Sequence, residues 1–367
     1  MRQKSRRSAE ACSLRAMNRS ATGRNGLLLG LCAAAVLLAG CASTWSLDVE
    51  SPAQPVQWVD HDNAPRARYL AAIKGFKESG ATLSGMLQYV VYGGRSGGTA
   101  LVRPVSAAVG RGDRIAIADA GCACVHLYVP SEQRYGKISR AGSEELRTPV
   151  SVVFDEESRL YVADSTGGAI HVFDQAGRHL SSIRKAGADP LRRPTGLSYA
   201  PDRKRLYVVD TLADRVHTFG TDGVLLSSFG GPGEQKGQFN FPTHIAAAPE
   251  RNLYVVDALN FRVQAFDASG AFLSSFGRHG NGSGDFAMPK GIGVDRSGVI
   301  FVVDTLFDNI QLFNATGGFL FTIGGRGSGP GEFSMPSGLF IDGQDKLYVC
   351  DTYNQRVQII QMLEGRP

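Results

Sequence analysis

The chain has 367 residues, of which 43% are hydrophobic and 20% are charged, and 45 of them are glycine. These proportions are typical of a folded protein and exclude a largely disordered chain. The formal net charge is +5, but residues 1–40 contain seven basic residues and one acidic residue, so the remainder is near −1. Nucleic-acid binding needs a strongly basic surface, so we expect no nucleic-acid partner for this remainder.

The first 40 residues have the organisation of a signal peptide. Basic residues precede an apolar run from Leu27 to Ala39, which is too short to cross a bilayer as a helix. The run ends in Leu38-Ala39-Gly40-Cys41. This sequence resembles the bacterial lipobox, in which cleavage leaves the cysteine as the first residue and lipids are attached to it. The resemblance implies that residues 1–40 are removed and that Cys41 carries a lipid anchor. An ordinary signal peptide with an incidental cysteine is the alternative.

The segment 41–65 contains Ser, Pro and Asp and is expected to be a tether between the lipid and a domain at 66–367. Ala42 follows the lipidated cysteine. In proteobacterial lipoproteins of the kind that the chain resembles, a residue other than Asp at this position implies transfer to the outer membrane. We therefore expect an exported bacterial lipoprotein that faces the periplasm or the cell surface.

Two segments precede the repeated part of the chain, which begins at about residue 103. Residues 68–73 have a strand pattern, and Tyr69–Ile73 aligns with Leu225–Phe229 further along. Residues 74–102 form an insertion whose apolar residues have helical spacing, namely Leu83, Met86, Leu87, Val90 and Val91. We expect a short helix that packs against the rest of the domain, with a docking element or a partial cap over the channel as the alternatives.

The most informative feature is a repeat of 45 to 47 residues marked by six aspartates. These are Asp119, Asp164, Asp210, Asp257, Asp304 and Asp351. Each follows a proline by 15 residues, or by 16 in the third copy. The prolines are Pro104, Pro149, Pro194, Pro242, Pro289 and Pro336. A fixed period of this length is typical of a propeller or a solenoid.

Each copy contains four short strand patterns with turn residues between them and no helical period, which predicts a four-stranded antiparallel blade. The sixth copy ends after its third strand, Arg356–Ile360, and lacks a fourth. The strand at 68–73 is the missing partner, because closing the last blade removes an exposed sheet edge. The predicted fold is therefore all-β, a monomeric six-bladed β-propeller whose last blade is closed by an N-terminal strand.

The repeated residues resemble the NHL repeat, whose copies contain Pro-x-Gly-Ile-x-Val-Asp, Leu-Tyr-Val-Val-Asp and Arg-Val-Gln-x-Phe. Copies four and six match best, at Asp257–Val263 and Asp351–Val357. The resemblance covers residues 100–367 and implies the propeller fold, but it implies no single function. Copies one and two depart from it, because Ser106 and Ser151 replace glycine and Cys124 and Ala169 replace arginine.

One position near the expected channel mouth differs sharply among the copies. The residues two after each proline are Ser106, Ser151, Gly196, His244, Gly291 and Gly338. Streptogramin lyases and peptide-amidating lyases, which resemble this fold, use histidines near this position. A zinc site needs three or more ligands, and no second histidine or glutamate occurs in this set. His244 is therefore either an imidazole satisfied by loop backbone or a group that contacts a ligand.

Three other histidines recur seven residues after their aspartates, at the position where later copies have glutamine. They are His126, His171 and His217. Packed sheets lie about 10 Å apart, so third strands of separate blades cannot share a metal, and we expect polar packing.

The aspartates themselves are predicted to accept hydrogen bonds from their own turns, with Arg215, Arg262 and Arg356 able to pair with them. Calcium sites of the gluconolactonase type need converging inner carboxylates, which this repeat lacks. We expect no metal and no cofactor.

Three cysteines remain in the predicted propeller, Cys122, Cys124 and Cys350. An exported protein permits disulfides, and neighbouring first and sixth blades would allow Cys350 to meet Cys122 or Cys124. The alternative is that Cys350 is a small core residue. Cys122-Ala-Cys124-Val-His126 is not the haem-attachment spacing, and as a metal site we expect it to be strained and incomplete.

These observations favour a binding or scaffold protein rather than an enzyme. The expected partner is an envelope protein, a peptide or a polysaccharide, held on the loop face at the channel mouth. The candidate contacts are His244, Lys290, Arg326, Phe261 and Tyr353. The alternative is a lyase or hydrolase that uses His244 with a metal.

Overall fold

The computed structural model describes residues 44–59, 63–79, 98–250 and 252–363. The chain divides into two compact units, and the blades belong to the larger one, Trp45–Lys77 with Gly98–Pro367. The expected signal peptide, Cys41 and the apolar residues of the helix predicted within 74–102 lie outside the described residues. In the part that is described, no helix is both long and apolar enough to cross a membrane.

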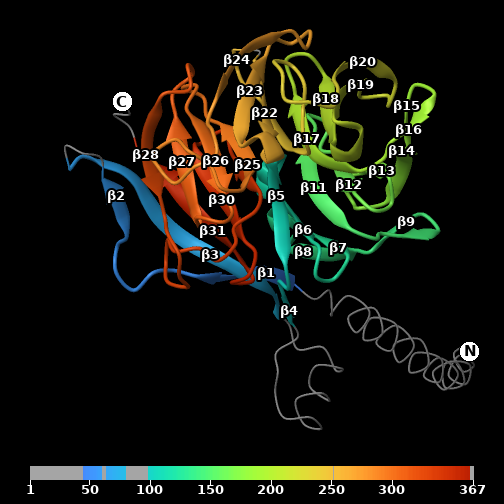
Figure 1. Cartoon of the computed structure of the whole chain (residues 1–367). Coiled ribbons are helices and arrows are strands. Elements are labelled where there is room, and N and C mark those ends of the chain that lie inside the picture. The colour runs from blue at the N-terminus through green and yellow to red at the C-terminus, as the bar shows by residue number, and fades with distance from the viewer. Residues whose placement is uncertain (1–43, 60–62, 80–97, 251, 364–367) are drawn as a thin grey trace, which may run out of the picture. The chain divides into compact units, whose positions relative to one another are not determined.

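Five blades are four-stranded antiparallel sheets whose strands are consecutive in sequence (Figure 1). Blade 1 contains β5 (Pro104–Gly110), β6 (Arg114–Asp119), β7 (Cys124–Val129) and β8 (Arg134–Ile138). Blade 2 contains β11 (Pro149–Phe154), β12 (Leu160–Asp164), β13 (Ala169–Phe173) and β14 (His179–Ile183). Blade 3 contains β17 (Pro194–Ala200), β18 (Arg205–Asp210), β19 (Arg215–Gly220) and β20 (Leu225–Gly230). Blade 4 contains β21 (Pro242–Ala247), β22 (Leu253–Asp257), β23 (Arg262–Phe266) and β24 (Phe272–Phe276). Blade 5 contains β25 (Pro289–Val294), β26 (Ile300–Asp304), β27 (Asn309–Phe313) and β28 (Phe319–Ile323).

The sixth blade is built from both ends of the unit. Its order is β29 (Leu339–Ile341), β30 (Lys346–Asp351), β31 (Arg356–Met362) and then β3 (Pro65–Ser79). Tyr69 is in register with Ile360 and Ile73 with Val357. In Figure 1, β3 (blue) lies beside β31 (red). The predicted closing strand is confirmed, and it extends beyond residues 68–73.

Part of the segment expected to be a tether (41–65) is sheet. The strands β1 (Thr44–Glu50) and β2 (Gln57–Val59) both pair with β3, as does β4 (Gly98–Ala100). Trp45 donates its backbone N–H to the carbonyl oxygen of Gln133 at 2.7 Å, which ties β1 to blade 1. The expectation of a free tether was therefore wrong for these residues, because polar composition does not show that a backbone pairs with a distant strand.

Short elements connect the strands. There are two hairpins between blades, β9 (Arg140–Ala141) with β10 (Glu144–Glu145) and β15 (Lys185–Ala186) with β16 (Asp189–Pro190). Four single 3-10 turns are η1 (Arg111–Asp113), η2 (Pro130–Glu132), η3 (Thr211–Ala213) and η4 (Ala258–Asn260).

The first strands of the six blades surround a common axis. Each contacts the next in the order β5, β11, β17, β21, β25, β29 and back to β5. The closure between blades 6 and 1 is made by hydrogen bonds, since the backbone N–H of Gly338 and the Oγ of Ser337 both donate to the carbonyl oxygen of Val105, at 3.0 and 3.1 Å. Six blades are thus present, and the innermost strand of each is the one that follows the repeated proline.

The second strands form the core between blades. All residues of Leu253–Asp257 and of Ile300–Asp304 are buried, because each blade packs on both faces against its neighbours. Buried phenylalanines from the connecting loops complete the packing. The Phe333 ring fills the space beside Gly324, where a Cβ would lie 2.2 Å from Phe333 Cε2. Gly324 also has a φ of +82°, so glycine is needed there for both reasons.

Candidate functional site

The six repeated aspartates serve the fold. Each carboxylate accepts a backbone N–H from the loop that leads into the first strand of its own blade. For example, Asp210 accepts from Arg192 and Arg193, at 2.8 and 2.7 Å. The aspartate therefore holds the end of the second strand to the start of the first. The predicted donation from its own turn is present in blades 1, 2 and 5, where Gly121, Gly167 and Leu306 donate their backbone N–H groups.

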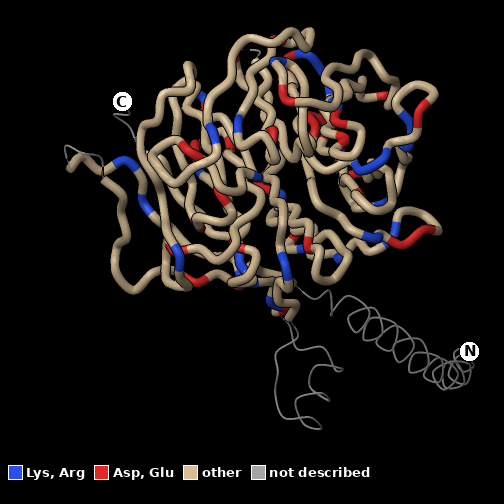
Figure 2. The backbone as a smooth tube through the Cα atoms, in the orientation of Figure 1, with Lys and Arg blue, Asp and Glu red and all other residues tan. Residues whose placement is uncertain are grey.

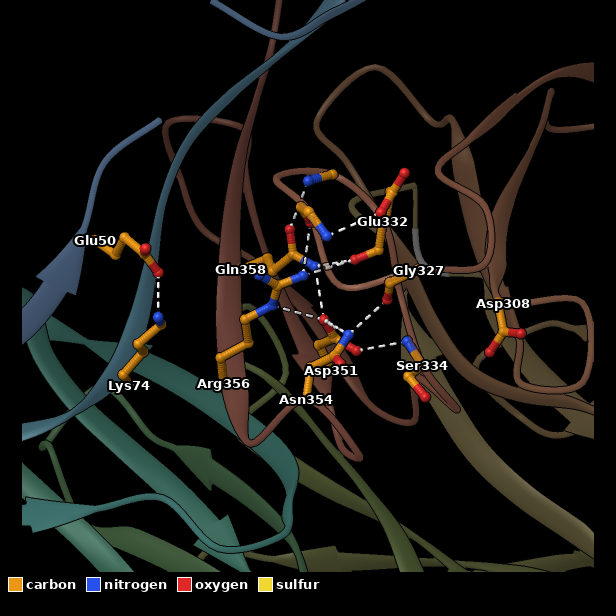
Figure 3. Close-up of polar contacts among 12 residues, drawn as sticks. Glu50, Lys74, Asp308, Gly327, Glu332, Ser334, Asp351, Asn354, Arg356 and Gln358 are labelled. Carbon is orange, nitrogen blue, oxygen red and sulfur yellow. Dashed lines mark hydrogen bonds and ion pairs between the residues drawn. The ribbon is translucent and has the colours of Figure 1, made fainter. Parts of the chain in front are cut away.

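In blades 4 and 6, side chains also converge on this aspartate. Figure 3 shows Asn354, Arg356 and Gln358 directed at the Asp351 carboxylate. All three donate to the same oxygen, Oδ2, at 2.9, 2.8 and 2.8 Å respectively. The pair predicted for Arg356 and the corresponding pair of Arg262 with Asp257 are present, each at 2.8 Å. The structure shows no such pair for Arg215 and Asp210, both of which it describes; the Nε2 of His217 lies 3.9 Å from Asp210 instead.

The axis of the propeller contains a cavity of about 190 Å³ lined by the first strands of all six blades. Its walls are mainly small and apolar, and His244 is the one histidine among them. No Asp, Glu or Cys lines the cavity, and a protein-bound zinc needs three or more ligands. The serines that replace glycine in the inner strands have a structural role, because Ser106 and Ser151 accept the backbone N–H groups of Val152 and Leu197 in the next blade.

His244 has no hydrogen-bond partner among the described residues, although both imidazole nitrogens are buried. The expectation that loop backbone satisfies this imidazole is therefore wrong. Burial, and secondly the positive charge of Lys290, lower the pKa of His244 from 6.5 to about 3. The imidazole is neutral at physiological pH, and a buried polar group without a partner costs about 1–3 kcal/mol. Such groups in a native protein call for an explanation, and a ligand is one.

Lys290 is the second basic group at this end of the cavity. It follows the proline that begins β25, and its carbonyl oxygen accepts a hydrogen bond from Thr243 Oγ1 at 3.2 Å. Burial is the main cause that lowers the pKa of Lys290, and the nearby charge of Arg103 lowers it further. Lys290 is therefore near enough to His244 for its charge to act on the imidazole.

The other three candidates lie on loops at the ends of second or fourth strands. Arg326 pairs with Asp308 at 2.8 Å, so its charge is already compensated. The Phe261 ring packs on His279, with ring centroids 4.4 Å apart. Tyr353 is 65% exposed. The structure thus brings His244 and Lys290 together and places the other three around them on the same end of the blades.

Sequence reasoning missed three exposed leucines at this end. The second residue after the repeated aspartate is apolar and about half exposed or more in four consecutive blades, at Leu212, Leu259, Leu306 and Tyr353. In an antiparallel blade the second strand ends where the first begins, so these side chains lie at the end that also carries His244 and Lys290. The signal was present in the repeat, because all four occupy one position of it.

Exposed arginines lie at this same end of blades 1 to 3. They lie one or two residues before the first strands and are Arg103, Arg147, Arg192 and Arg193. None of them forms an ion pair with a residue that the structure describes. Figure 2 shows basic and acidic residues interspersed over the blades. We call these four arginines, Lys290, His244 and the four apolar residues at the strand ends the mouth surface.

The recurring third-strand histidines are separate, as predicted. The Nδ1 atoms of His171 and His217 are 2.8 Å from Ser182 Oγ and Ser228 Oγ, within their own blades. His126 differs, because its Nε2 is 3.8 Å from Cys122 Sγ and 3.6 Å from Cys124 Sγ. Cys122 and Cys124 form a disulfide, and Cys350 is a free, buried thiol. The suggested pairing of Cys350 with either cysteine was wrong, and its alternative, a small core residue, is what the structure shows.

Comparisons with known proteins support the fold. A family model described as "6-bladed beta-propeller" matches residues 297–359. No curated protein matches the sequence. Among solved structures, a gluconolactonase from Xanthomonas campestris is 16% identical with a TM-score of 0.55, over 72% of this chain and 87% of that one.

Two further solved structures are similar. A catalytically inactive virginiamycin B lyase from Staphylococcus aureus with quinupristin is 13% identical with a TM-score of 0.53, over 71% of this chain and 95% of the lyase. A protein of unknown function from Bacteroides thetaiotaomicron is 13% identical with a TM-score of 0.56, over 88% and 76%. At these identities the similarity shows the β-propeller fold alone, on which proteins of varied function are built.

Proposed function

We propose that the protein is a lipid-anchored binding propeller of the bacterial envelope that holds an acidic protein segment or peptide on the mouth surface. The observation that carries the proposal is the pair formed by His244, whose two buried nitrogens lack partners, and Lys290 beside it. An anionic group at the cavity entrance would compensate Lys290 and accept a hydrogen bond from His244. The arginines on blades 1 to 3 extend this preference for negative charge.

The apolar part of the mouth surface favours a peptide over a polysaccharide. Leu212, Leu259, Leu306 and Tyr353 offer exposed side chains on four blades. Three of them are aliphatic and suit the apolar side chains of a protein segment, whereas sugars stack on aromatic rings. Each leucine is about half exposed, so burying it completely adds about 1 kcal/mol, roughly half the value for a fully exposed leucine. The cavity of about 190 Å³ is smaller than typical ligand pockets, so we expect a single side chain or chain terminus to enter it.

The anchoring part of the proposal rests on the sequence that ends at Cys41. Two or more acyl chains hold a protein stably at a membrane, whereas one does not. Substitution Cys41→Ser should abolish incorporation of labelled fatty acid and shift the protein from the membrane fraction to the soluble fraction. Unchanged fractionation together with unchanged labelling would refute the anchor.

The binding proposal can be tested by comparing three immobilised proteins in envelope extract. The first is wild type, the second carries Arg192→Glu, Arg193→Glu and Lys290→Glu, and the third carries Arg178→Glu. Arg178 is a matched control, because its side chain is 82% exposed but belongs to an ion pair with Asp174 away from the mouth surface. We expect wild type and the Arg178→Glu control to retain the same proteins from the extract, and raised salt to release them. The triple variant should not retain these proteins.

Two outcomes would count against this proposal. Equal retention by all three proteins would show that the mouth surface is not used. If uronate oligosaccharides compete for binding and acidic peptides do not, the partner is a polysaccharide and not a peptide.

The alternative, an enzyme that uses His244 with a metal, lacks a second metal ligand in the cavity lining. The cavity offers His244 without another histidine or a carboxylate in its lining, and metal-assisted hydrolysis or elimination needs several ligands on the ion. We therefore retain the binding role as the function that the geometry supports best.

A further inference from the structure

Blades 4 and 6 define three positions whose side chains converge on one point. These positions lie three, five and seven residues after the repeated aspartate and hold Asn, Arg and Gln in both blades. Around Asp351 they place three nitrogen atoms within 2.9 Å of a single oxygen atom (Figure 3). Around Asp257 the corresponding distances are 2.9, 2.8 and 3.1 Å. The backbone of this turn therefore directs three side chains at one small volume.

Blade 1 has three metal-ligating side chains at the same positions. Cys122, Cys124 and His126 stand where blades 4 and 6 have Asn, Arg and Gln. Their ligand atoms all lie within 4.8 Å of one another. The expectation of a strained and incomplete site was based on the spacing of known motifs, whereas the convergence follows from the turn that carries these residues. The replacement also removes the guanidinium that would repel a cation.

The disulfide between Cys122 and Cys124 contributes little to the stability of the fold. The stabilisation that a disulfide gives through loop closure grows with loop length, and these cysteines are two residues apart. The other five blades form the corresponding turn without a disulfide at these positions. A purely structural role therefore leaves the choice of cysteine at both positions unexplained.

We propose that the reduced Cys122 and Cys124 thiolates and His126 Nε2 form a binding site for one thiophilic closed-shell cation, Zn²⁺ or Cu⁺. With metal–sulfur and metal–nitrogen distances of about 2.3 and 2.0 Å, a tetrahedral site has sulfur–nitrogen separations of about 3.5 Å. The separations from His126 Nε2 are 3.8 Å to Cys122 Sγ and 3.6 Å to Cys124 Sγ. The imidazole is thus already at ligand distance from both sulfur atoms, and only the sulfur–sulfur separation has to increase on reduction.

The surroundings of His126 orient it as a ligand. Its Nδ1 is 2.8 Å from the Tyr135 hydroxyl, so the tautomer that donates from Nδ1 leaves the Nε2 lone pair toward the sulfur atoms. Phe76 stacks on the imidazole with ring centroids 5.5 Å apart and on Tyr135 at 4.5 Å, which restricts both rings. Asp119 Oδ2 lies 3.5 Å from Nε2 and adds a negative charge that attracts a cation.

Access and oxidation state would control occupancy. Cys124 and His126 are buried, whereas Cys122 is half-buried in the turn and gives the cation a route from solvent. A small dithiol opens the disulfide by supplying two electrons and two protons, and it becomes a cyclic disulfide itself. Cation binding then releases the two thiol protons to solvent. The oxidised form has no thiolate, so it does not bind the cation.

The test uses the purified full chain in oxidised and reduced forms, titrated with Zn²⁺ and separately with Cu⁺ against chromophoric chelators. Two variants remove ligands with little change of volume or pattern: Cys122→Ser with Cys124→Ser, and His126→Gln, which installs the side chain that blades 4 to 6 use at this position. The matched control is His171→Gln, because His171 occupies the same position in blade 2 without neighbouring cysteines. Thermal unfolding of every variant checks that it is folded.

We expect one additional equivalent of cation in the reduced wild type and in the control, and none in the oxidised protein or in either ligand variant. Substitution of Co²⁺ should add thiolate charge-transfer absorption in the wild type that the double serine variant lacks. The proposal is overturned if reduced wild type binds no more of either cation than the double serine variant, or if oxidised wild type binds as much as the reduced protein. It is also overturned if His171→Gln abolishes binding as His126→Gln does.

Discussion

Tyr69 is in register with Ile360, so the strand that closes the last blade comes from a part of the chain that precedes all the repeats. Ala72 lies in the same strand, is fully buried, and packs in the cluster that joins blades 5 and 6. The propeller therefore depends on a contact between its two chain ends, as expected for a β-structure that must hide its sheet edges.

We predict that Ala72→Asp destabilises the protein by about 3 kcal/mol or more, because it buries an unpaired charge in the closing strand. The measurement is the free energy of unfolding in urea. Arg68→Asp is the control on the same strand, since Arg68 is exposed, and it should change stability by about 0.5 kcal/mol or less. Equal effects of the two substitutions would contradict the role of β3 in closing the blade.

A second prediction concerns the clamp in blade 6. Asp351→Ala leaves the Arg356 side chain, which is only 6% exposed, without its counter-charge, and should cost about 3–5 kcal/mol. Asp304 in blade 5 accepts backbone N–H groups and has no arginine partner among the described residues, so Asp304→Ala should cost about 2 kcal/mol. Adding Arg356→Asn to Asp351→Ala should recover part of the loss, since blade 5 has Asn309 there. No recovery in the double variant would show that the buried guanidinium is not the cause.

The architecture was predictable because the regular spacing of the repeat indicates which strands follow one another in each blade, whatever residues the loops contain. The missing fourth strand in the sixth copy likewise located its replacement at 68–73. The pairing of β1 and β2 was not predictable from spacing, because their partners are distant in sequence. A signal existed, since Trp45 and Trp58, the two tryptophans of the chain, lie in the segment taken for a tether.

The site was predictable in position but not in environment. His244 is an exception in a column of small residues, so the sequence identifies it. Whether its imidazole nitrogens find a hydrogen-bond partner depends on the first strands of several other blades, which no local sequence pattern describes. Cys122, Cys124 and His126 were dismissed for a similar reason, because their convergence follows from the turn geometry that blades 4 and 6 make visible. The exposed leucines escaped notice because only one copy, with Tyr353, carries an aromatic residue there.

A third prediction tests the close approach of first strands at the axis. A Cβ on Gly338 would lie 2.4 Å from the carbonyl oxygen of Val105, a backbone atom that cannot move without disturbing the contact between blades 6 and 1. Gly338→Ala should therefore lower the free energy of unfolding by about 2 kcal/mol. Gly325→Ala is the control, because a Cβ there has no atom within 4 Å, and it should be nearly neutral. Similar losses in both variants would refute the steric explanation.

The last prediction concerns pH and His244. Its pKa falls from 6.5 to about 3 on folding, chiefly because of burial and secondly because of Lys290. Between these two values the unfolded state binds more protons than the folded state, so stability is full above about pH 6.5 and is lost as pH falls toward 3. His244 as a residue is partly exposed and lines the cavity, which reduces the effect, so we expect a loss of about 2–3 kcal/mol from this group.

His244→Ser places at this position the residue that blades 1 and 2 use, and it removes the titrating group. Urea unfolding of wild type and variant at about pH 7 and about pH 4 should show a smaller decrease in the variant. His171 and His217, whose pKa values are also lowered by burial, contribute equally to both proteins and cancel in the comparison. Parallel pH profiles would mean that His244 has a partner in solution.

A ligand that donates a hydrogen bond to the imidazole would stabilise its neutral form, whereas the anion proposed for the mouth surface would favour protonation and raise the pKa. Repeating the measurement with an acidic peptide bound should therefore shift the wild-type transition to higher pH and leave that of the variant unchanged.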